Sequence, residues 1–438
     1  MTGPQGGFRR VLSTWDATMV VVGGIIGAGI FINPYIVARS LDSTVAVIAA
    51  WVTGGLIALA GAFAYAELGA VAPRAGGQYV YLRDAFHPLA GFLYGWALLF
   101  MIEGGAIAAV AQAFAQYLLR ALDSTAATTP IAVLAIVLVS AINYVGVRPG
   151  SRVLNVFVAL KLLALGILIG AGLLLPEPTP GTAAPVLSGS VTVMAFGAAL
   201  VPIMFSYGGW QNANYVAEEM RDPVRQLPRA LLIGTLIVVL VYVSVNGIYL
   251  KALGHPGLAG TLTPAADTAG RIAGSVGQRL ISLAIAVSTF GFLHLTVLAP
   301  TRVYWAMADD RLFFRKVATL HPRFGTPTVA ILLQSTWAVL LTLTGKYEQL
   351  VGYVVSADWI FFGLSVVALF VYRKRIPLAS RPPGMFSTPG YPLLPALFVV
   401  AAAYVVISVA WSSPARTALG ALLLLTGVPA YLLWKGRA

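Results

Sequence analysis

The sequence predicts an all-α integral membrane protein with 12 transmembrane helices. Of its 438 residues, 59% are hydrophobic and only 10% are charged, whereas roughly a quarter of the residues of a soluble domain are charged. A membrane-spanning helix needs about 20 apolar residues, so the chain has room for about a dozen spans and for no separate soluble domain. Two of these spans are interrupted by glycine and polar residues, which indicates a binding site inside the membrane.

Twelve apolar runs are long enough to be spans, and charged residues or turn-forming residues separate them. Since the number is even, both ends of the chain should lie on the same side of the membrane. The predicted spans are Trp15–Ala38, Val45–Val71, Leu89–Leu119, Ile131–Val147, Val153–Leu175, Val191–Val216, Ala230–Leu250, Gln278–Met307, Pro327–Thr344, Leu350–Tyr372, Tyr391–Trp411 and Ala415–Trp434.

The basic residues orient these spans. When the N-terminus is placed in the cytoplasm, most of the 28 lysine and arginine residues fall in cytoplasmic segments, including Arg373, Lys374 and Arg375 after the tenth span. Cytoplasmic loops carry an excess of lysine and arginine. We therefore expect a multi-pass protein of the cell membrane with cytoplasmic N- and C-termini. The net charge of +13 fits such loops and does not require a nucleic acid as a partner.

The first span contains a glycine pair that favours a break in its helix. In VVVGGIIGAGIFINP, residues 20–34, Gly27 and Gly29 flank Ala28, and each glycine costs a helix roughly 1 kcal/mol relative to alanine. Opened backbone at membrane depth is tolerated only where it is buried in protein or lines a wet cavity. Its freed N–H groups would face an anion there. The alternative is that the glycines only let another helix approach closely.

The sixth span carries a second break. Its sequence VPIMFSYGGWQNANYVAEEM, residues 201–220, contains Pro202, then Gly208 and Gly209, then the polar residues Gln211 and Asn212. Interruptions at matching positions of two halves of a chain point to the binding site of an inverted-repeat transporter. The main hypothesis is therefore a substrate site between the first and the sixth spans.

Five segments, in order over nearly the whole chain, carry a family pattern. They are GGIIGAGIF (residues 23–31), YAELGAVAPRAGGQYVYLRDAFHPLAGFLYGW (65–96), FSYGGWQNANYVAEEMRDPVRQLPRA (205–230), VSTFGFLHLTVLAPTRVYWAMADDRLFF (287–314) and VSADWIFFGL (355–364). Together they resemble the amino acid–polyamine–organocation (APC) superfamily of transporters, and within it the L-amino-acid transporter branch.

The resemblance implies a LeuT-like five-plus-five inverted repeat with two additional C-terminal helices. Residues 15–175 would form the first repeat and residues 191–373 the second. Residues 391–434 would form the last two spans, with residues 1–14 and 435–438 as cytoplasmic ends. The resemblance also implies alternating access and an amino acid as the substrate.

By the same resemblance, backbone groups at the two breaks bind the zwitterion. The N–H groups around Ala28 would take the carboxylate, and carbonyls freed at both breaks would take the ammonium. This arrangement needs no charged side chain deep in the membrane. Phe205 would close over the substrate as a gate, and the alternative is an ordinary packed aromatic ring. The expected substrate-binding residues are Ile25, Ile26, Gly27, Ala28, Gly29, Phe205, Ser206, Tyr207 and Gly208.

Lys161 lies in the middle of the fifth span, in NVFVALKLLALG. A lysine at the bilayer centre costs at least about 3 kcal/mol and usually has a function. In the family, a lysine here reaches the first and eighth helices, where sodium-coupled relatives hold a cation. The hydroxyl groups nearby would be those of Ser288 and Thr289. The ammonium would then replace the ion, which implies sodium independence. A proton-linked role and a lysine that snorkels to the interface are the alternatives.

Three further polar residues are candidates for a role in specificity or proton transfer. Glu103 in the third span stands where the family pattern has an uncharged residue, and it would either be merely hydrogen-bonded or contact the substrate side chain or a proton. His294 in the eighth span is a candidate of the same kind, with a satisfied interior histidine as its alternative. Asn212 follows the second break and would line the pocket or cap the half-helix.

Charged residues of the loop after the sixth span are expected to form a gate or scaffold on the cytoplasmic side. Glu218, Glu219, Asp222 and Arg225 would pair there with Arg302 or Arg74 and would not bind the substrate. Exposed ion pairs of this kind are individually weak.

The sequence contains few features that would indicate another class of function. An enzyme would need a nucleophile–base pair, a metal cluster or a phosphate loop, and the four histidines are scattered. We therefore expect no catalytic residues, no metal and no cofactor. The chain has no cysteine, so a disulfide-linked ancillary subunit of the kind that eukaryotic relatives have is impossible. We expect the protein to function alone, with membrane lipid and an amino acid as its only partners.

The mode of transport is less constrained than the class. An exchanger or uniporter of L-amino acids is the main hypothesis, and a proton-coupled symporter is the alternative. A channel and a non-transporting amino-acid sensor are the rivals from other classes.

Overall fold

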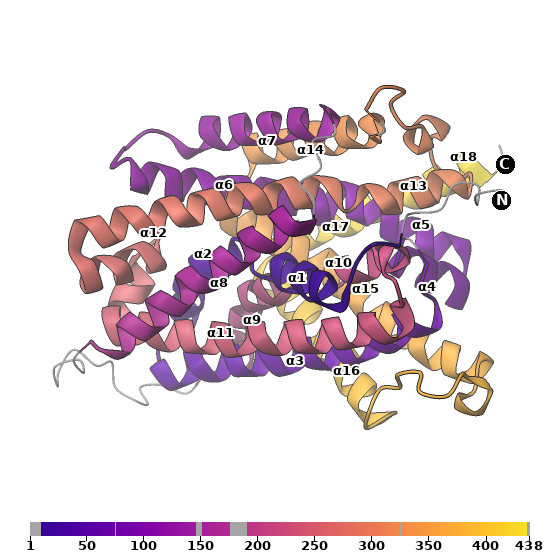
Figure 1. Ribbon diagram of the computed structural model, residues 1–438, viewed down its shortest axis with the longest axis horizontal. Coiled ribbons are helices and arrows are strands. Elements are labelled where there is room, and N and C mark those ends of the chain that lie inside the picture. Colours follow the sequence, from indigo (N-terminus) through magenta and orange to yellow (C-terminus); the bar gives the residue numbers. More distant parts are fainter. Residues whose placement is uncertain (1–9, 75, 146–150, 176–190, 325, 436–438) are drawn as a thin grey trace.

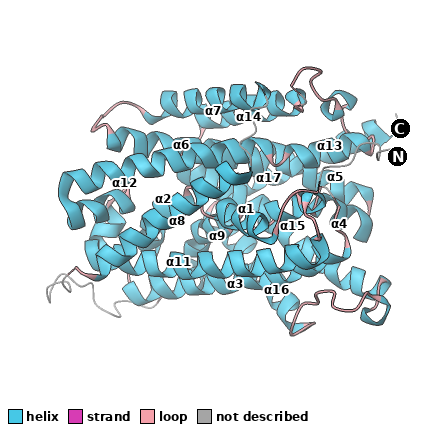
Figure 2. Ribbon diagram, in the orientation of Figure 1, coloured by secondary structure: helices cyan, strands magenta, loops and turns pink. Residues whose placement is uncertain are grey.

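The computed structural model describes residues 10–74, 76–145, 151–175, 191–324 and 326–435, without the side chains of residues 151–154. In this part of the chain, Figure 2 shows only helices and loops. Eleven helical segments are long and apolar enough to cross a membrane, and Thr328–Thr344 is a shorter apolar helix. The prediction of an all-α integral membrane protein is confirmed. The count of 12 spans and the inverted repeat stay predictions.

The helices follow the predicted spans closely. In chain order they are α1 (Thr14–Ile25), α2 (Gly29–Ser40), α3 (Thr44–Val71), α4 (Gln78–Ala85), α5 (Pro88–Ala97), α6 (Glu103–Ala121), α7 (Thr128–Val145), α8 (Ser151–Leu173), α9 (Val193–Tyr207), α10 (Asn212–Tyr215), α11 (Pro223–Gly260), α12 (Pro264–Leu298), α13 (Thr301–Asp309), α14 (Thr328–Thr344), α15 (Tyr347–Arg375), α16 (Leu393–Ser412), α17 (Pro414–Leu425) and α18 (Gly427–Lys435). Short turns of other helix types are η1 (Leu98–Ile102), η2 (Ala217–Glu219), η3 (Arg315–Ala318) and η4 (Leu378–Ser380).

Three predicted spans differ from the observed helices in a way that the sequence pattern did not indicate. The third span is divided by η1, a π-helical turn, into α5 and α6. A short helix that begins at Pro264 precedes the eighth span and is separated from it where Ala273 and Gly274 leave helical geometry, and the span itself is divided before Thr301 into α12 and α13. The last span is divided at Thr426 into α17 and α18. At η1 the apolar pattern continues across the irregular turn, so hydrophobicity alone does not reveal it.

The first predicted break is confirmed. Helix α1 ends at Ile25, and α2 begins at Gly29. Ile26 leaves helical geometry with ψ at 77°, and the N–H of Gly27 donates to the carbonyl of Ile25 at 2.7 Å instead of continuing the helix. Ser13 caps the start of α1, where its hydroxyl accepts the N–H of Asp16.

The second predicted break is also confirmed, but it begins later than expected. Helix α9 remains regular to Tyr207, and α10 begins at Asn212. Gly209 adopts a φ of +111°, which side-chain-bearing residues rarely do. Its Cα also faces the first break, since a Cβ at this position would lie 2.1 Å from the carbonyl oxygen of Gly24. Glycine is therefore required where the two broken helices touch.

The broken helices occupy the middle of the bundle. Helix α1 contacts α8, α10 and α11, and α2 contacts α9 and α11. Figure 1 shows α1 between a group formed by α3 and α11 and a group formed by α6 and α12. The apolar window of Thr14–Ser40 is 89% buried, compared with 17% for Pro414–Lys435. The non-helical backbone of the first break is therefore buried in protein, which is the condition for opened backbone at membrane depth.

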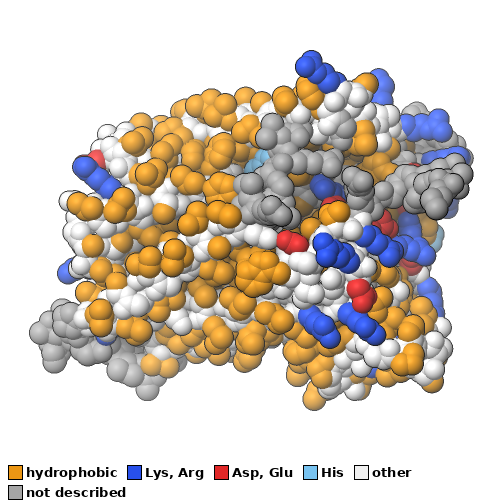
Figure 3. Space-filling view, in the orientation of Figure 1, with side chains coloured by type: hydrophobic (Ala, Val, Ile, Leu, Met, Phe, Trp, Pro, Cys, Tyr) orange, Lys and Arg blue, Asp and Glu red, His pale blue; other side chains and the backbone are white. Residues whose placement is uncertain are grey.

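The surface separates an apolar belt from a charged end. Large hydrophobic side chains are exposed along the outer helices, for example Leu160 and Ile167 on α8 and Leu240 on α11. In Figure 3 hydrophobic side chains cover the middle of the visible face, and most lysine and arginine side chains gather toward one end. Helices α4, α5, α13 and α18 lie at that end (Figure 1). The described part of the chain therefore has the charge asymmetry that was used to orient the spans.

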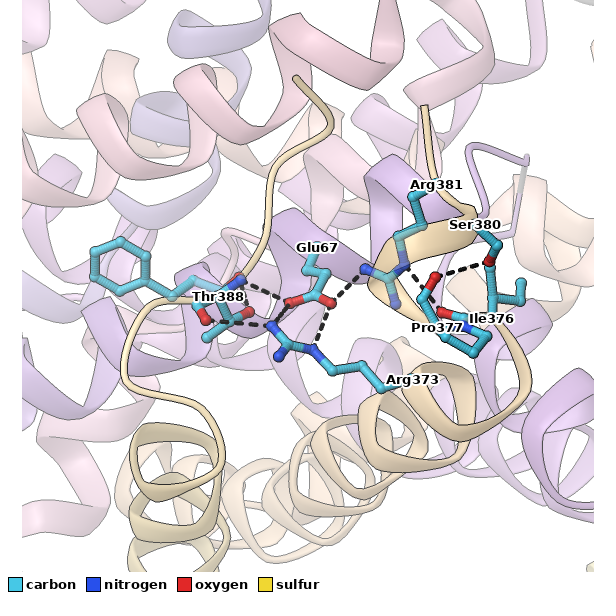
Figure 4. A network of polar contacts seen from close by, with 8 residues as sticks. Glu67, Arg373, Ile376, Pro377, Ser380, Arg381 and Thr388 are labelled. Carbon is cyan, nitrogen blue, oxygen red and sulfur yellow. Dashed lines mark hydrogen bonds and ion pairs between the residues drawn. The ribbon is translucent and has the colours of Figure 1, made fainter. Parts of the chain in front are cut away.

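A buried charge cluster ties α3 to the segment after α15 at the same end. The carboxylate of Glu67 on α3 accepts hydrogen bonds from Arg373 at 2.6 and 2.7 Å and from Arg381 at 2.6 Å. The N–H of Thr388 donates to the same carboxylate at 2.6 Å (Figure 4). Since Glu67 is fully buried, loss of one partner would leave an uncompensated buried charge. This cluster fixes the loop between α15 and α16 onto α3.

We expect Gly209→Ala to destabilise the protein. The positive φ alone costs about 1–3 kcal/mol for a residue with a side chain, and the new methyl group would clash with Gly24. The apparent midpoint of thermal unfolding in detergent, followed by size-exclusion chromatography, should fall. Gly247→Ala on α11 is the matched control, because no atom lies within 4 Å of the new Cβ. Equal midpoints for both variants would contradict this account of the contact.

Candidate functional site

A cavity of about 70 Å³ lies between the two breaks. Its wall is completed by α6, α12 and α15, which contribute Glu103, Thr296 and Asp358 among others. The expected site residues that line it are Ile25, Gly27, Ala28, Gly29, Glu103, Phe205, Gly208 and Asn212. The tertiary structure therefore brings most of the predicted residues together around one cavity.

Three of the expected substrate-binding residues do not line this cavity. Ile26 is fully buried and its carbonyl faces Lys161. Ser206 turns toward α2, where its hydroxyl accepts a hydrogen bond from Asn33 at 2.8 Å. Tyr207 turns toward α3, where its hydroxyl donates to the carbonyl of Trp51 at 3.2 Å. The last turn of α9 is still helical here, so successive side chains point in different directions, and Met204 and Phe205 line the cavity whereas Ser206 and Tyr207 do not.

The backbone of the first break offers donors to the cavity. Helix α2 begins at Gly29, and the N–H groups of a first helical turn have no carbonyl partner within the helix. The positive end of the α2 dipole lies at the same place. The N–H of Gly27, by contrast, already donates to Ile25. The N–H of Phe31 also donates, to the carbonyl of Ala28 at 3.1 Å. Ala28, Gly29 and Ile30 are therefore better placed than Gly27 to bind an anion.

The carbonyl groups of the first break already have protein partners. The carbonyl of Ile25 accepts the hydroxyl of Tyr242 at 3.0 Å and the N–H of Gly27. The carbonyl of Ile26 accepts the ammonium of Lys161. Tyr242 also donates to the carbonyl of Ser206 at 3.2 Å, so this one hydroxyl joins the two breaks. Sequence reasoning missed Tyr242, because nothing local in the seventh span points to a break in the first.

Lys161 holds the first break from the side opposite the cavity. Its side chain is 7% exposed, its ammonium donates to Ile26, and it lies 5.6 Å from the ring centre of Phe292. An ammonium that turns inward to a carbonyl does not snorkel to the membrane interface. The hydroxyl of Thr289 donates to the carbonyls of Ile285 and Ala286 within its own helix.

A second, apolar crevice of about 390 Å³ opens beside Lys161. Ser288 and His294 line this crevice and not the cavity between the breaks. The Ser288 hydroxyl and the Nε2 atom of His294 are buried without a hydrogen-bond partner among the described residues. His294 is thus placed near Lys161, away from the position where a substrate would touch the broken backbone.

Two carboxylic side chains line the cavity, and only one of them was singled out from the sequence. Glu103 begins α6 directly after the π-helical turn η1, and such turns are frequent at functional sites. Asp358 on α15 was missed, although a single acidic residue in the apolar segment VSADWIFFGL was a usable signal. Glu103 and Asp358 are 6% and 8% exposed. The two carboxylic groups therefore stand in a lining that is otherwise mostly apolar.

One side of the cavity is closed by contacts between α2, α9 and α15. The amide of Asn33 donates to the carbonyl of Pro202 at 2.7 Å and to Ser206 at 2.8 Å, and Tyr347 donates to the oxygen of the same amide at 3.1 Å. The ring of Phe205 meets Tyr347 edge to face with centroids 6.4 Å apart. Phe205 therefore contacts both the cavity and the residues of this side.

The other side is closed near the charged end of the molecule. The N–H groups of Val11 and Leu12 both donate to the carbonyl of Glu219 at 2.9 Å, and Arg302 lies 3.4 Å from the Glu219 carboxylate. The expected pair between this loop and Arg302 is confirmed.

The alternative partner, Arg74, was predicted wrongly. Arg74 pairs with Asp84 at 3.5 Å, because α4 brings Asp84 closer than the acidic loop. Arg225 pairs within its own helix start with Asp222 at 3.9 Å.

Comparisons with known proteins agree with this architecture. The family model for amino acid permeases matches residues 12–433. The serine/threonine exchanger SteT of Bacillus subtilis is 31% identical over 99% of this chain and 98% of its own length. The human large neutral amino acids transporter small subunit 2 is 30% identical over 98% of this chain and 82% of its own length. The human Asc-type amino acid transporter 1 is 29% identical over 98% of this chain and 83% of its own length. The chain therefore belongs to the amino acid permease family of the APC superfamily, with relatives in the L-amino-acid transporter branch.

Proposed function

We propose that this protein transports L-amino acids across the cell membrane by alternating access, as an exchanger or uniporter that is independent of sodium. The observation that carries the proposal is the cavity between two broken helices, which exposes backbone groups and not a catalytic constellation. The curated relatives support it, since their names describe a serine/threonine exchanger and transporters of amino acids.

The zwitterion would bind across the two breaks. Its carboxylate would accept hydrogen bonds from the N–H groups of Ala28, Gly29 and the first turn of α2, at the positive end of that helix dipole. Its ammonium would be held by carbonyls at the end of α9, around Phe205 and Gly208, and by Ile25 if Tyr242 releases it. Because both charges of the substrate meet peptide dipoles, no ionised side chain is needed for this part of the molecule.

Lys161 supports sodium independence. Its ammonium, which extends from α8, already donates a hydrogen bond to a carbonyl of the first break. A fixed positive charge in this place would hold the break in shape without a bound cation. The arrangement also explains why the cost of a buried lysine is tolerated at membrane depth.

Phe205 is proposed as the gate on the side of Asn33 and Tyr347. Opening on that side would separate α2 from α9 and α15, and opening on the other side would break the contacts of Glu219 with Arg302 and with the start of the chain. The two closures involve different residues, so one can open while the other stays shut. That independence is what alternating access requires.

The remaining parts of the proposal concern topology. The chain would cross the membrane 12 times as two inverted groups of five spans and a final pair, with both ends in the cytoplasm. The charged end seen in Figure 3 supports this orientation. The absence of cysteine excludes a disulfide-linked ancillary subunit, which favours a transporter that functions alone.

Proton-coupled symport is the second candidate mode. Glu103 and Asp358 favour it, because carboxylic groups in the membrane often form proton relays. A pH gradient applied in the assay below separates this mode from exchange.

The first prediction is that the purified protein mediates counterflow. Proteoliposomes preloaded with a mixture of unlabelled amino acids should accumulate a labelled amino acid transiently, with the same initial rate in sodium and in choline medium. Exchange predicts that empty vesicles take up little label, and proton symport predicts that an inward pH gradient restores that uptake. A requirement for sodium would contradict the role of Lys161. No counterflow with any amino acid would contradict transport and favour a sensor.

The second prediction concerns the gate. Phe205→Ala should lower the initial counterflow rate by at least about tenfold, which corresponds to about 1.4 kcal/mol, since the substrate would no longer be covered. Phe196→Ala is the matched control, because Phe196 lies on the same helix but does not line the cavity. Thermal unfolding of both variants shows whether either has simply lost stability. Equal transport by Phe205→Ala and the wild type would remove the gate assignment.

The third prediction concerns the lysine. Lys161→Met keeps most of the apolar side-chain volume but leaves the carbonyl of Ile26 without its cationic partner. We expect counterflow to be lost while the purified protein still elutes as a single species. Lys374→Met, at an exposed position after the membrane-spanning part of α15, should transport as the wild type does. Normal kinetics in Lys161→Met would show that the ammonium is dispensable.

A further inference from the structure

Two buried carboxylic groups face the cavity without a partner. Oε2 of Glu103 and Oδ1 of Asp358 have no hydrogen-bond partner among the described residues. Both side chains are more than nine-tenths buried, and both line the cavity between the breaks. Asp358 also lies within electrostatic reach of Glu103. The two groups therefore act on the same small volume.

The protein itself provides no cation for this volume. In the part of the chain that the structure describes, no lysine, arginine or histidine lines the cavity. The ammonium of Lys161 is bonded to Ile26 on the other side of the first break. The nearby polar groups are neutral, such as the hydroxyl of Thr296, which donates to Phe292 within its own helix. The hydroxyls of Tyr94 and Tyr215 are hydrogen-bonded to each other.

An unpaired carboxylate in such a place is unfavourable. Several kcal/mol per ion are lost when a charge leaves water, and the loss is recovered only by a close partner of opposite charge. Across the membrane interior, acidic residues usually pair with one another or mark a pathway for substrate or ions. The missing partner of Glu103 and Asp358 is therefore expected to arrive with the ligand.

The α-amino and α-carboxyl groups of the substrate do not meet this requirement. If the proposed function is correct, both are held by the backbone of α1, α2 and α9. Glu103 and Asp358 come from α6 and α15, which form another part of the wall. The part of an amino acid left to face them is its side chain.

We propose that Glu103 and Asp358 form the side-chain subsite of this transporter and that it selects amino acids whose side chain ends in an ammonium group. This inference rests on the proposed function. A cationic side chain would complete two charge-assisted hydrogen bonds. An acidic side chain would be repelled, and an aliphatic one would leave both carboxylic groups unpaired. Ornithine is a short amino acid with a side chain of this kind.

The test compares two amino acids that differ only in the terminal ammonium. Ornithine and norvaline share the same five-carbon backbone, and each is used to compete with labelled alanine for counterflow in proteoliposomes. For the wild type we expect ornithine to compete at a concentration about tenfold lower than norvaline, a difference of about 1.4 kcal/mol. Lysine and norleucine form a second matched pair with one more methylene group.

Conservative variants assign the preference to the two residues. Glu103→Gln and Asp358→Asn keep the side-chain shapes and remove the charge, and each should abolish the preference for ornithine over norvaline. Asp309→Asn, at an exposed position at the end of α13, is the control and should keep the preference. If a variant fails to transport alanine, direct binding of ornithine and norvaline to the purified protein replaces the transport assay.

The outcomes are distinguishable. No counterflow of any amino acid by the wild type would refute the proposed function itself. Counterflow in which norvaline competes as well as ornithine would leave transport intact and overturn the subsite. Variants that change the pH dependence of transport but keep the wild-type preference would also overturn it, since the pair would then bind a proton and not the substrate.

Discussion

Peptide groups inside a membrane must find partners within the protein, and the two helix breaks of this chain are built around that constraint. At the first break, Tyr242 and Lys161 hold the carbonyls of Ile25 and Ile26. At the second, the positive φ of Gly209 lets the chain turn directly against Gly24. The breaks are therefore stable features of the fold, and what they leave unpaired faces one cavity.

The cavity has two chemically different regions, because its backbone groups and its acidic side chains lie in different parts of the wall. Backbone carbonyls of α1 are largely occupied, whereas the first turn of α2 keeps unpaired N–H groups that suit a carboxylate. The region formed by α6 and α15 instead presents Glu103 and Asp358. A ligand that fits both regions has a zwitterionic end and a basic side chain, so a single arrangement of helices relates substrate binding to substrate choice.

The contacts on either side of the cavity are separate in sequence and in chemistry. On one side, Asn33 links α2 to α9 and α15 through neutral hydrogen bonds. On the other, Glu219 links the start of the chain to α13 through backbone hydrogen bonds and an ion pair with Arg302. The buried cluster of Glu67 with Arg373 and Arg381 holds α3 and the end of α15 together independently of both. The three sets of contacts therefore share no residue, which fits the proposed separate opening of the two sides.

The sequence by itself determined the membrane class, the approximate spans and both breaks, because hydrophobicity, glycine and proline act locally on the helix. It also pointed to Lys161 and Glu103, since a charge within an apolar run is conspicuous. It did not reveal Tyr242, Asn33 or Asp358, nor did it separate Phe205 from Ser206 and Tyr207, because these roles depend on which helix lies opposite each side chain. It also grouped His294 with Glu103 and Asn212, which line a different cavity. Only the tertiary structure decided these assignments, because packing between distant helices, and not local propensity, sets the direction of each side chain.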